Sequence, residues 1–351
     1  MGNKKNIVVG DCINKRSNNL NLMKFIAAIL VIFSHSFRIS WNTIDPLDTF
    51  TGGQISFGGV AVALFLFASG FYVSKGLFRR KKGTLYFKNR FARIYPAFAV
   101  VILVTVFIMG PIVSKYSFKE YLGRKDTYIY LLYILMIPQY ILPGVFEGNP
   151  YSGIVNGSLW TLPLEVICYI GLYVAYVCRI LQKKVLKILN PLLLIGVCVA
   201  LGFRVTGIHQ YHSYLRTIFI FFIWIKYYIF KDEIKLSGKR AVVAVVATIG
   251  LFAIHWGDVA AIYCFPYLFS VVMFAEKQIS EKIASLGNYS YAIYLVAFPI
   301  QQILVSCFSG MNPFVNTLYA SICSILCGIL IYHCVEIPVA NLLLHSHDNK
   351  K

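Results

Sequence analysis

Apolar residues gather along this chain in long runs that are separated by short polar segments. Most runs reach or approach the roughly 20 residues needed to cross a hydrocarbon core about 30 Å thick. In lipid a helix satisfies its backbone polar groups internally, so such runs predict spanning helices. We predict about ten of them, at residues 20–38, 56–77, 94–113, 160–181, 189–206, 214–231, 241–256, 259–275, 289–308 and 315–336.

A further apolar stretch, residues 128–142, is shorter and contains Pro138. As a helix its 15 residues would rise only about 23 Å. If it crossed the membrane, every later loop would change sides, and the basic clusters at 179–187 and 226–240 would lie outside. Lys and Arg favour cytoplasmic loops. We therefore expect both termini to be cytoplasmic and the stretch to form a re-entrant or interfacial piece of a long outer segment.

The composition agrees with a membrane protein. Of the 351 residues 58% are hydrophobic and 13% are charged, which excludes an ordinary water-soluble domain. The net charge of +19 would suggest nucleic acid in a soluble chain, but cytoplasmic Lys and Arg explain it here. We predict an all-α polytopic integral protein of the plasma membrane that contacts lipid and no nucleic acid. The first apolar run lacks a cleavage site and should stay attached.

The nine cysteines predict neither disulfides nor a metal site. Nearly all of them lie within apolar runs, where Cys behaves as a small hydrophobic residue. Cys323, Cys327 and His333 could be imagined as metal ligands, but no second cluster with ligand spacing accompanies them. Helix packing is the favoured interpretation.

Two ionisable residues of the first span call for an explanation, because burying such groups in a bilayer is costly. Lys24 and His35 are eleven residues apart. On a helix they fall within about 20° of one face and about 16 Å apart along the axis. The stripe could serve both ends of a polar path through the protein. Lys24 could instead extend its amine to the membrane surface, and His35 could be a buried histidine bonded to a carbonyl.

Glu165 is the third such residue. It lies six residues into a span that opens with the sequence Asn-Gly-Ser-Leu-Trp at 156–160. A structural hydrogen bond to a neighbouring helix would explain it. So would pairing at a buried site, and His35 falls at comparable depth in a helix running the opposite way.

Glycines and a basic block surround the second and third spans. Gly59 and Gly70 let helices approach closely, and this packing role explains the two glycines without any catalytic or binding function. The residues Arg79-Arg80-Lys81-Lys82, Lys88, Arg90 and Arg93 form a denser basic block than orientation requires. This block could bind anionic lipid or the phosphates of a nucleotide cofactor.

Together these residues resemble the acyltransferase-3 family of integral membrane acyltransferases. The similarity extends over nearly the whole chain in the family's order. It is carried by six motifs: Lys24 with His35; Gly59 through Ser69-Gly70-Phe71; Arg90, Arg93 and Pro96; Ser158-Leu159-Trp160 with Glu165; Ser290-Tyr291 with Tyr294-Leu295; and Glu336 with Pro338. The resemblance implies a basic cytoplasmic segment at 1–19, a membrane acyltransferase domain at 20–338 and a cytoplasmic tail at 339–351, without the hydrolase-like domain of some relatives.

The resemblance also implies a reaction. An acyl group, most often acetyl, would pass from cytoplasmic acetyl-CoA or another acyl-CoA to a hydroxyl of a cell-surface or lipid-linked glycan. His35 would be the general base or transient acyl acceptor, and Glu165 would orient it. Lys24, Arg90 and Arg93 would hold the CoA phosphates, with Arg79 and Arg80 as weaker candidates. Ser69, Trp160 and Tyr291 would belong to the substrate site or to structural motifs, and no metal is implied.

The sequence departs from the family pattern at one position. Many members have a histidine between the Tyr-Leu pair and the following proline, where this chain has Ala297. A transporter or flippase for a glycan or anionic small molecule is the main alternative function, although carriers usually contain an internal repeat and none is found. A scaffolding protein would leave the buried Lys, His and Glu without a purpose.

Overall fold

The computed structural model describes residues 7–13, 19–205, 209–275, 283 and 285–345. These residues form a succession of helices, so the predicted all-α class is confirmed. The chain divides into two units, which we describe separately: unit 1 holds residues 1–27, 47–81 and 164–287, and unit 2 holds residues 28–46, 82–163 and 288–351. Helices α2 (Leu20–Trp41), α3 (Pro46–Phe50) and α9 (Thr161–Val177) contribute residues to both units.

Unit 1 is built around α4, which packs against α11. The Phe67 and Trp224 rings of these two helices have centroids 3.8 Å apart. A Cβ atom at Gly70 would lie 3.0 Å from the carbonyl oxygen of Phe221, so the glycine allows the two helices to approach closely without displacing the α11 backbone. The elements of unit 1 are α1 (Val9–Cys12), α4 (Phe57–Arg80), α10 (Lys183–Val205), α11 (His209–Ile229), α12 (Gly238–Ala253), α13 (Gly257–Val259), a π-helical turn (Ala260–Cys264) and α14 (Phe265–Met273).

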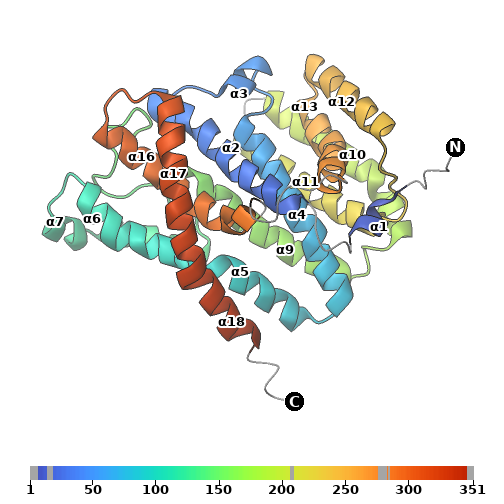
Figure 1. Cartoon of the computed structure of the whole chain (residues 1–351), viewed down its shortest axis with the longest axis horizontal. Coiled ribbons are helices and arrows are strands. Elements are labelled where there is room, and N and C mark those ends of the chain that lie inside the picture. The colour runs from blue at the N-terminus through green and yellow to red at the C-terminus, as the bar shows by residue number, and fades with distance from the viewer. Residues whose placement is uncertain (1–6, 14–18, 206–208, 276–282, 284, 346–351) are drawn as a thin grey trace. The chain divides into compact units, whose positions relative to one another are not determined.

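In unit 2, helices α16 and α17 run side by side (Figure 1). A Cβ atom at Gly328 of α17 would lie 2.8 Å from the Ile293 side chain of α16, which explains the small residue there. The elements of unit 2 are α5 (Gly83–Val104), a π-helical turn (Thr105–Met109), α6 (Gly110–Val113), α7 (Phe118–Gly123), α8 (Lys125–Ile129), two 3₁₀ helices (Tyr130–Leu135 and Gly157–Trp160), α16 (Ser290–Cys307), α17 (Pro313–Ile331), a π-helical turn (Tyr332–Glu336) and α18 (Ile337–His345). A third 3₁₀ helix (Ser285–Tyr289) leads into α16.

Six helical segments in the described part of the chain are long and apolar enough to cross a bilayer: Leu20–Trp41, Phe57–Arg80, Gly83–Val113, Gly157–Val177, Ser285–Cys307 and Pro313–Leu344. The other four predicted ranges coincide with α10, α11, α12 and the run Gly257–Met273. Of these, α12 has only 16 residues, and α10 begins with Lys183, Lys184 and Lys187. The chain is therefore a helical membrane protein, and the count of ten stays a prediction.

Two spans are longer than the apolar pattern indicates. The third begins at Gly83, directly after Lys81 ends α4 in a left-handed conformation with φ 55°. Arg90 and Arg93 consequently lie within a helix that continues through Pro96. The last span continues past Pro338 to α18, through a π-helical turn. Such turns change the local backbone hydrogen bonding, which makes room for a proline that has no N–H to donate.

The stretch 128–142 forms no long helix. Its first residues end α8, its centre is the six-residue 3₁₀ helix Tyr130–Leu135, and Ile141 then pairs with Ile154 in an isolated bridge. Tyr130 and Tyr133 are fully buried. Asn149 donates to Gln302 Oε1 at 2.7 Å, and Gln302 in turn donates to the Tyr151 carbonyl at 2.8 Å. The residues that directly follow this stretch are thus attached to α16.

Candidate functional site

In unit 1 the predicted residue Glu165 meets two hydroxyl groups. Ser69, at the middle of α4, donates to Glu165 Oε1 at 2.6 Å. Tyr169, one turn after Glu165 on α9, donates to the same oxygen at 2.5 Å. The Ser69 and Tyr169 oxygens are themselves 2.5 Å apart. The structure therefore brings Ser69 and Glu165 together and adds Tyr169, which the sequence analysis missed. The sequence feature that could have identified Tyr169 is its four-residue spacing from Glu165, which places both side chains on one helix face.

The geometry of this cluster holds the Glu165 carboxylate in place. Three close oxygen–oxygen contacts join the three side chains, and the two hydroxyl groups supply the two donors for them. The cluster therefore presents a carboxyl group in a fixed position, which is the geometry that general acid–base catalysis requires.

In unit 2, His35 lies on α2 beside an aromatic ring and an acid. Its imidazole packs edge-on against Phe298, with ring centroids 5.2 Å apart. The preceding residue, Ser34, donates to Asp45 Oδ2 at 2.5 Å. Asp45 is 2% exposed and also acts electrostatically on His35. Asp45 was missed by the sequence analysis, because it follows the first span in a stretch that reads as a loop.

The residue after His35 anchors α2 in a buried polar network. Gln301 Nε2 donates to the Ile32 carbonyl at 2.8 Å and to Ser36 Oγ at 2.7 Å. The same amide lies 3.0 Å from Asn316 Oδ1, and Thr317 donates to Ser36 at 2.8 Å. Ser36, Gln301 and Asn316 are completely buried. Three helices of unit 2, α2, α16 and α17, are therefore held in one rotational setting around the helix turn that carries His35.

Two of the family-like motifs also meet in unit 2. Asn156 Nδ2 donates to the Leu295 carbonyl at 2.9 Å, and Ser158 Oγ donates to Asn156 Oδ1 at 2.7 Å. The Tyr294 hydroxyl donates to the Ser158 carbonyl and contacts Thr161 Oγ1 at 2.7 Å. The Ser-Leu-Trp motif thus interlocks with the Tyr-Leu motif of α16. Trp160 ends the 3₁₀ helix here and is half-buried.

The predicted donor-binding residues lie on two helices. On α5, Arg90 is half-buried and Arg93 is exposed, and their three-residue spacing puts them on neighbouring positions of one face. Tyr291 of α16 donates to the Ile94 carbonyl at 2.8 Å, which fixes α5 directly beside Arg93. Tyr291 therefore links α16 to α5, and its assignment to the substrate site or to a structural motif stays a prediction. Lys24 is half-buried on α2.

The predicted site residues are distributed over both units. Lys24, Ser69 and Glu165 belong to unit 1, and the remaining predicted site residues belong to unit 2: His35, Arg90, Arg93, Trp160 and Tyr291. The pairing of Glu165 with His35 would join the two units, and it stays a prediction. Ala297, at the position of the missing family histidine, is buried in α16.

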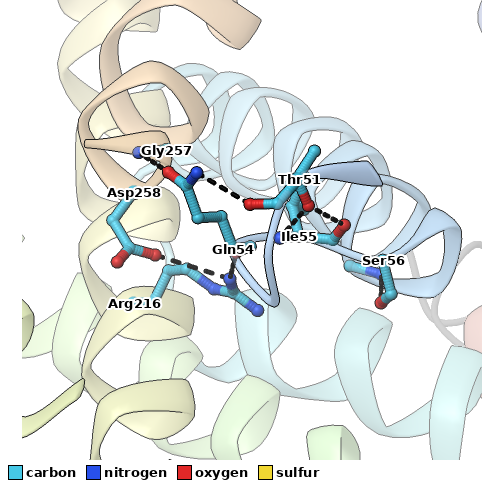
Figure 2. Close-up of polar contacts among 8 residues, drawn as sticks. Thr51, Gln54, Ile55, Ser56, Arg216, Gly257 and Asp258 are labelled. Atoms are coloured by element: carbon cyan, nitrogen blue, oxygen red, sulfur yellow. Dashed lines mark hydrogen bonds and ion pairs between the residues drawn. The ribbon is translucent and has the colours of Figure 1, made fainter. Parts of the chain in front are cut away.

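Unit 1 contains a second polar group, which we call the Gln54 cluster (Thr51, Gln54, Arg216, Gly257 and Asp258; Figure 2). Arg216 forms an ion pair with Asp258 at 3.4 Å, and Asp258 is 1% exposed. Gln54 accepts from the Gly257 N–H at 2.9 Å and donates to the Thr51 carbonyl at 2.8 Å. A side chain that bridges two loops in this way makes both of them rigid.

Comparison with known proteins identifies the family. A family model described as an acyltransferase domain matches residues 17–333. The chain belongs to the acyltransferase-3 family. It is an enzyme of the O-acetyltransferase type, which sets aside the transporter and scaffold alternatives. The resemblance inferred from the six motifs is thereby confirmed.

Two curated relatives agree with this assignment. An "O-acetyl transferase" of Shigella phage Sf6 is 27% identical over 297 residues, which are 83% of this chain and 86% of the relative. "Nodulation protein 10" of Rhizobium leguminosarum bv. viciae is 30% identical over 167 residues, which cover 44% of this chain and only 43% of that relative. No solved structure matches the chain at a significant level.

Proposed function

We propose that this family member transfers an acyl group, in the first instance acetyl, from cytoplasmic acyl-CoA to a hydroxyl of a cell-surface or lipid-linked glycan. The observation that carries the proposal is the acyltransferase family match over residues 17–333, a range that includes every predicted site residue. The O-acetyl transferase of phage Sf6 supports acetyl as the transferred group and oxygen as the acceptor atom.

The chemistry follows from the groups described above. As general base, the imidazole of His35 removes the proton of the acceptor hydroxyl, and the oxygen attacks the thioester carbonyl. The carbon–sulfur bond then breaks, and the departing CoA thiolate takes up the proton. As the second route, the imidazole itself accepts the acyl group before the glycan does. Glu165, held by Ser69 and Tyr169, orients His35 and provides the second proton-accepting group.

On the donor side, we infer that Lys24, Arg90 and Arg93 bind the phosphates of CoA, with Arg79 and Arg80 nearby in sequence. Guanidinium groups bind phosphate oxygens through two parallel hydrogen bonds, and Lys contributes a point charge. The approximately 16 Å rise between Lys24 and His35 along a helix matches a donor that is bound at one face and reacts near the other. No metal takes part.

The proposed topology has ten crossings in the plasma membrane and both termini in the cytoplasm. Residues 1–19 and 339–351 then flank a membrane domain at 20–338, and residues 114–157 form a long outer segment with an interfacial or re-entrant piece. This arrangement keeps the basic clusters at 179–187 and 226–240 inside.

The test is acyl transfer by the purified full-length protein in lipid nanodiscs. Acetyl-CoA is supplied with surface glycans extracted from cells that lack this protein, and release of the CoA thiol is followed together with acetyl incorporation by mass spectrometry. We expect CoA release that depends on the glycan. The variant His35→Ala should lower it by about 10²–10⁴-fold, the usual contribution of a general base.

The matched control is His333→Ala, which removes an exposed histidine on the last span. This control should keep the activity. Full glycan-dependent CoA release by His35→Ala would contradict the catalytic role of His35. The absence of any glycan-dependent release by the unmodified protein, with either acetyl-CoA or succinyl-CoA, would contradict the proposed function as a whole.

A further inference from the structure

Unit 1 contains a cavity of about 590 Å³ beside the Gln54 cluster. Its walls come from residues 47–55, from the last turns of α12 and from the loop after it. The volume is typical of a small-molecule site. The residues that matter for its chemistry are Phe50, Ile249, Phe252, Ala253 and His255.

One wall of this cavity presents a positioned polar group. The Gly257 N–H donates to Gln54 Oε1, which determines which end of the Gln54 amide carries the hydrogens. The nitrogen of this amide donates to the Thr51 carbonyl at 2.8 Å and to the Phe252 carbonyl at 2.9 Å, which uses both of its hydrogens. His255 Nδ1 lies 3.4 Å from the same nitrogen, and an imidazole ring can form hydrogen bonds to a ligand through its two nitrogens. His255 is exposed, and its φ of 60° is the left-handed conformation that ends α12, where its N–H donates to the Phe252 carbonyl at 3.1 Å.

The opposite wall is apolar and continuous with the surface of α12. Ile249 lines the cavity and is 64% exposed. It continues a row of exposed valines on the same helix, which consists of Val242, Val245 and Val246. In a membrane protein such a row faces lipid tails. Phe50, at the cavity, is 88% exposed. A ligand can therefore keep a hydrocarbon part along α12 while its polar part reaches His255.

We propose that this cavity binds the lipid-linked form of the glycan acceptor, with its hydrocarbon along Ile249 and Phe252 and the adjoining polar group hydrogen-bonded by His255. The inference rests on the proposed function and narrows its acceptor from a glycan in general to one attached to a membrane lipid. In the proposed topology residues 39–55 lie outside, on the side of the membrane where the outer end of the first span places His35.

The experiment uses the purified full-length protein in detergent micelles and a defined probe, N-acetylglucosamine linked through phosphate to a farnesyl chain that carries a photoreactive group. Cross-linked peptides are mapped by mass spectrometry, and apparent affinity is taken from the saturation of cross-linking. We expect labelling at residues 249–255. The variant Ala253→Trp, which fills the cavity from an exposed position, should weaken apparent affinity at least tenfold.

Two further variants make the result specific. Val243→Trp adds the same bulk to an exposed position of α12 that does not line the cavity, and it should leave affinity unchanged. His255→Ala should weaken binding of the sugar-linked probe and leave binding of a photoreactive farnesol unchanged. Unaltered affinity in Ala253→Trp would overturn the proposal. Equal competition by phosphatidylglycerol, or by N-acetylglucosamine alone, would also overturn it.

The proposed function is read out separately by His35-dependent CoA release with a water-soluble glycan fragment. If that release occurs while Ala253→Trp binds the lipid-linked probe normally, only this inference fails. If the probe binds as expected but no acyl transfer to any glycan is found, the binding site stands and the proposed function fails.

Discussion

Glu165 illustrates how a single residue acquires its chemical environment. Its position within an apolar span indicates that it needs a polar partner. The partners are the hydroxyl groups of Ser69 and Tyr169, and Ser69 lies 96 positions away in the chain. Both hydroxyls contact the same carboxyl oxygen, so the loss of either one removes a hydrogen bond that holds the carboxylate in place.

The variant Tyr169→Phe should lower the rate of acyl transfer by about tenfold or more. It removes one hydrogen bond to a carboxylate, which contributes about 1.5–3 kcal/mol, and leaves the ring in place. Tyr176→Phe on the same helix is the control, since its ring packs against Phe78. Initial rates of CoA release measure the effect. Equal rates in both variants would show that the cluster is only structural.

Asp45 gives a second prediction at this scale. Asp45→Asn removes the negative charge that acts on His35 but keeps an oxygen for the Ser34 hydroxyl. We expect acyl transfer to fall about tenfold or more, because a neighbouring carboxylate stabilises a histidine that takes up a proton. Asp126→Asn, at an exposed carboxylate of the outer segment, should have no effect. A pH profile that is the same for Asp45→Asn and the unmodified enzyme would argue against this role.

At the scale of helices, polar contacts determine which face of each apolar helix points toward the neighbouring helices. The pattern of α2, α16 and α17 is nearly uniformly apolar, so it does not specify which side faces protein. The buried network around Ser36, Gln301 and Asn316 does specify it, because its hydrogen bonds join α2, α16 and α17 and form only when these faces point toward one another.

Gln301→Leu should therefore lower the midpoint of thermal unfolding of unit 2. The substitution removes the hydrogen bonds that the Gln301 amide donates to Ser36 Oγ and to the Ile32 carbonyl, each of which contributes about 0.5–1.5 kcal/mol. Unfolding in detergent can be followed by the reactivity of Cys323 and Cys327, the half-buried thiols of α17 in unit 2. Gln182→Leu, at an exposed position, is the matched control. An unchanged midpoint in Gln301→Leu would mean that the network does not stabilise this packing.

The outer segment gives a prediction about pH. Lys115 lies 2.5 Å from Glu147, which holds the pKa of that carboxyl below its usual value, and Glu147 also accepts from the Gly144 N–H. A lowered pKa in the folded state stabilises the segment above the carboxyl's unfolded pKa of about 4.3. This stabilisation is lost as pH falls through the lower folded value.

Proteolysis of the segment should accordingly increase when the pH is lowered below about 4, as measured with an acid-active protease. Glu147→Gln should show the higher susceptibility already at neutral pH and little further change on acidification. Both residues are about half exposed, so the effect should weaken at high salt. A pH dependence identical in the variant and the unmodified protein would rule out this ion pair as its cause.

At the scale of the whole molecule the open quantity is the number of crossings. Among the residues that the structure describes, six helical segments meet the length and composition needed to span, and four further helical runs coincide with the remaining predicted ranges. Residues 125–154 form short helices and bends, and their place outside the membrane stays a prediction. The side on which each later loop lies depends on this segment.

Single cysteines in a background without the nine native ones should settle the sides. With ten crossings, Asp126→Cys should react in intact cells with a membrane-impermeant maleimide, whereas Lys184→Cys and Lys235→Cys should react only after the cells are opened. Labelling of Lys184→Cys and Lys235→Cys in intact cells would mean that the stretch 128–142 crosses the membrane or that the orientation is reversed.

The sequence by itself determined the membrane class, the positions of most helices and the family. These properties depend on the order of apolar runs, basic loops and short motifs along one dimension, and lipid as a solvent makes helices out of such runs. It also selected His35 and Glu165, since ionisable groups are conspicuous where the surroundings are apolar, whereas Ser69 was selected only through the family resemblance.

Only the tertiary structure decided which groups these residues meet. In a soluble protein, polar and apolar helix faces indicate which side is buried, but in a membrane the lipid-facing and protein-facing sides are both apolar. The rotation of each helix, and with it the contacts of Glu165 with Ser69 and of Ser36 with Gln301, comes from side-chain packing between segments distant in the chain. The contact of Gln54 with Gly257 likewise joins segments that are far apart in sequence. The long third and last spans likewise depend on local backbone geometry at Lys81 and at the final π-helical turn, which apolar periodicity does not report.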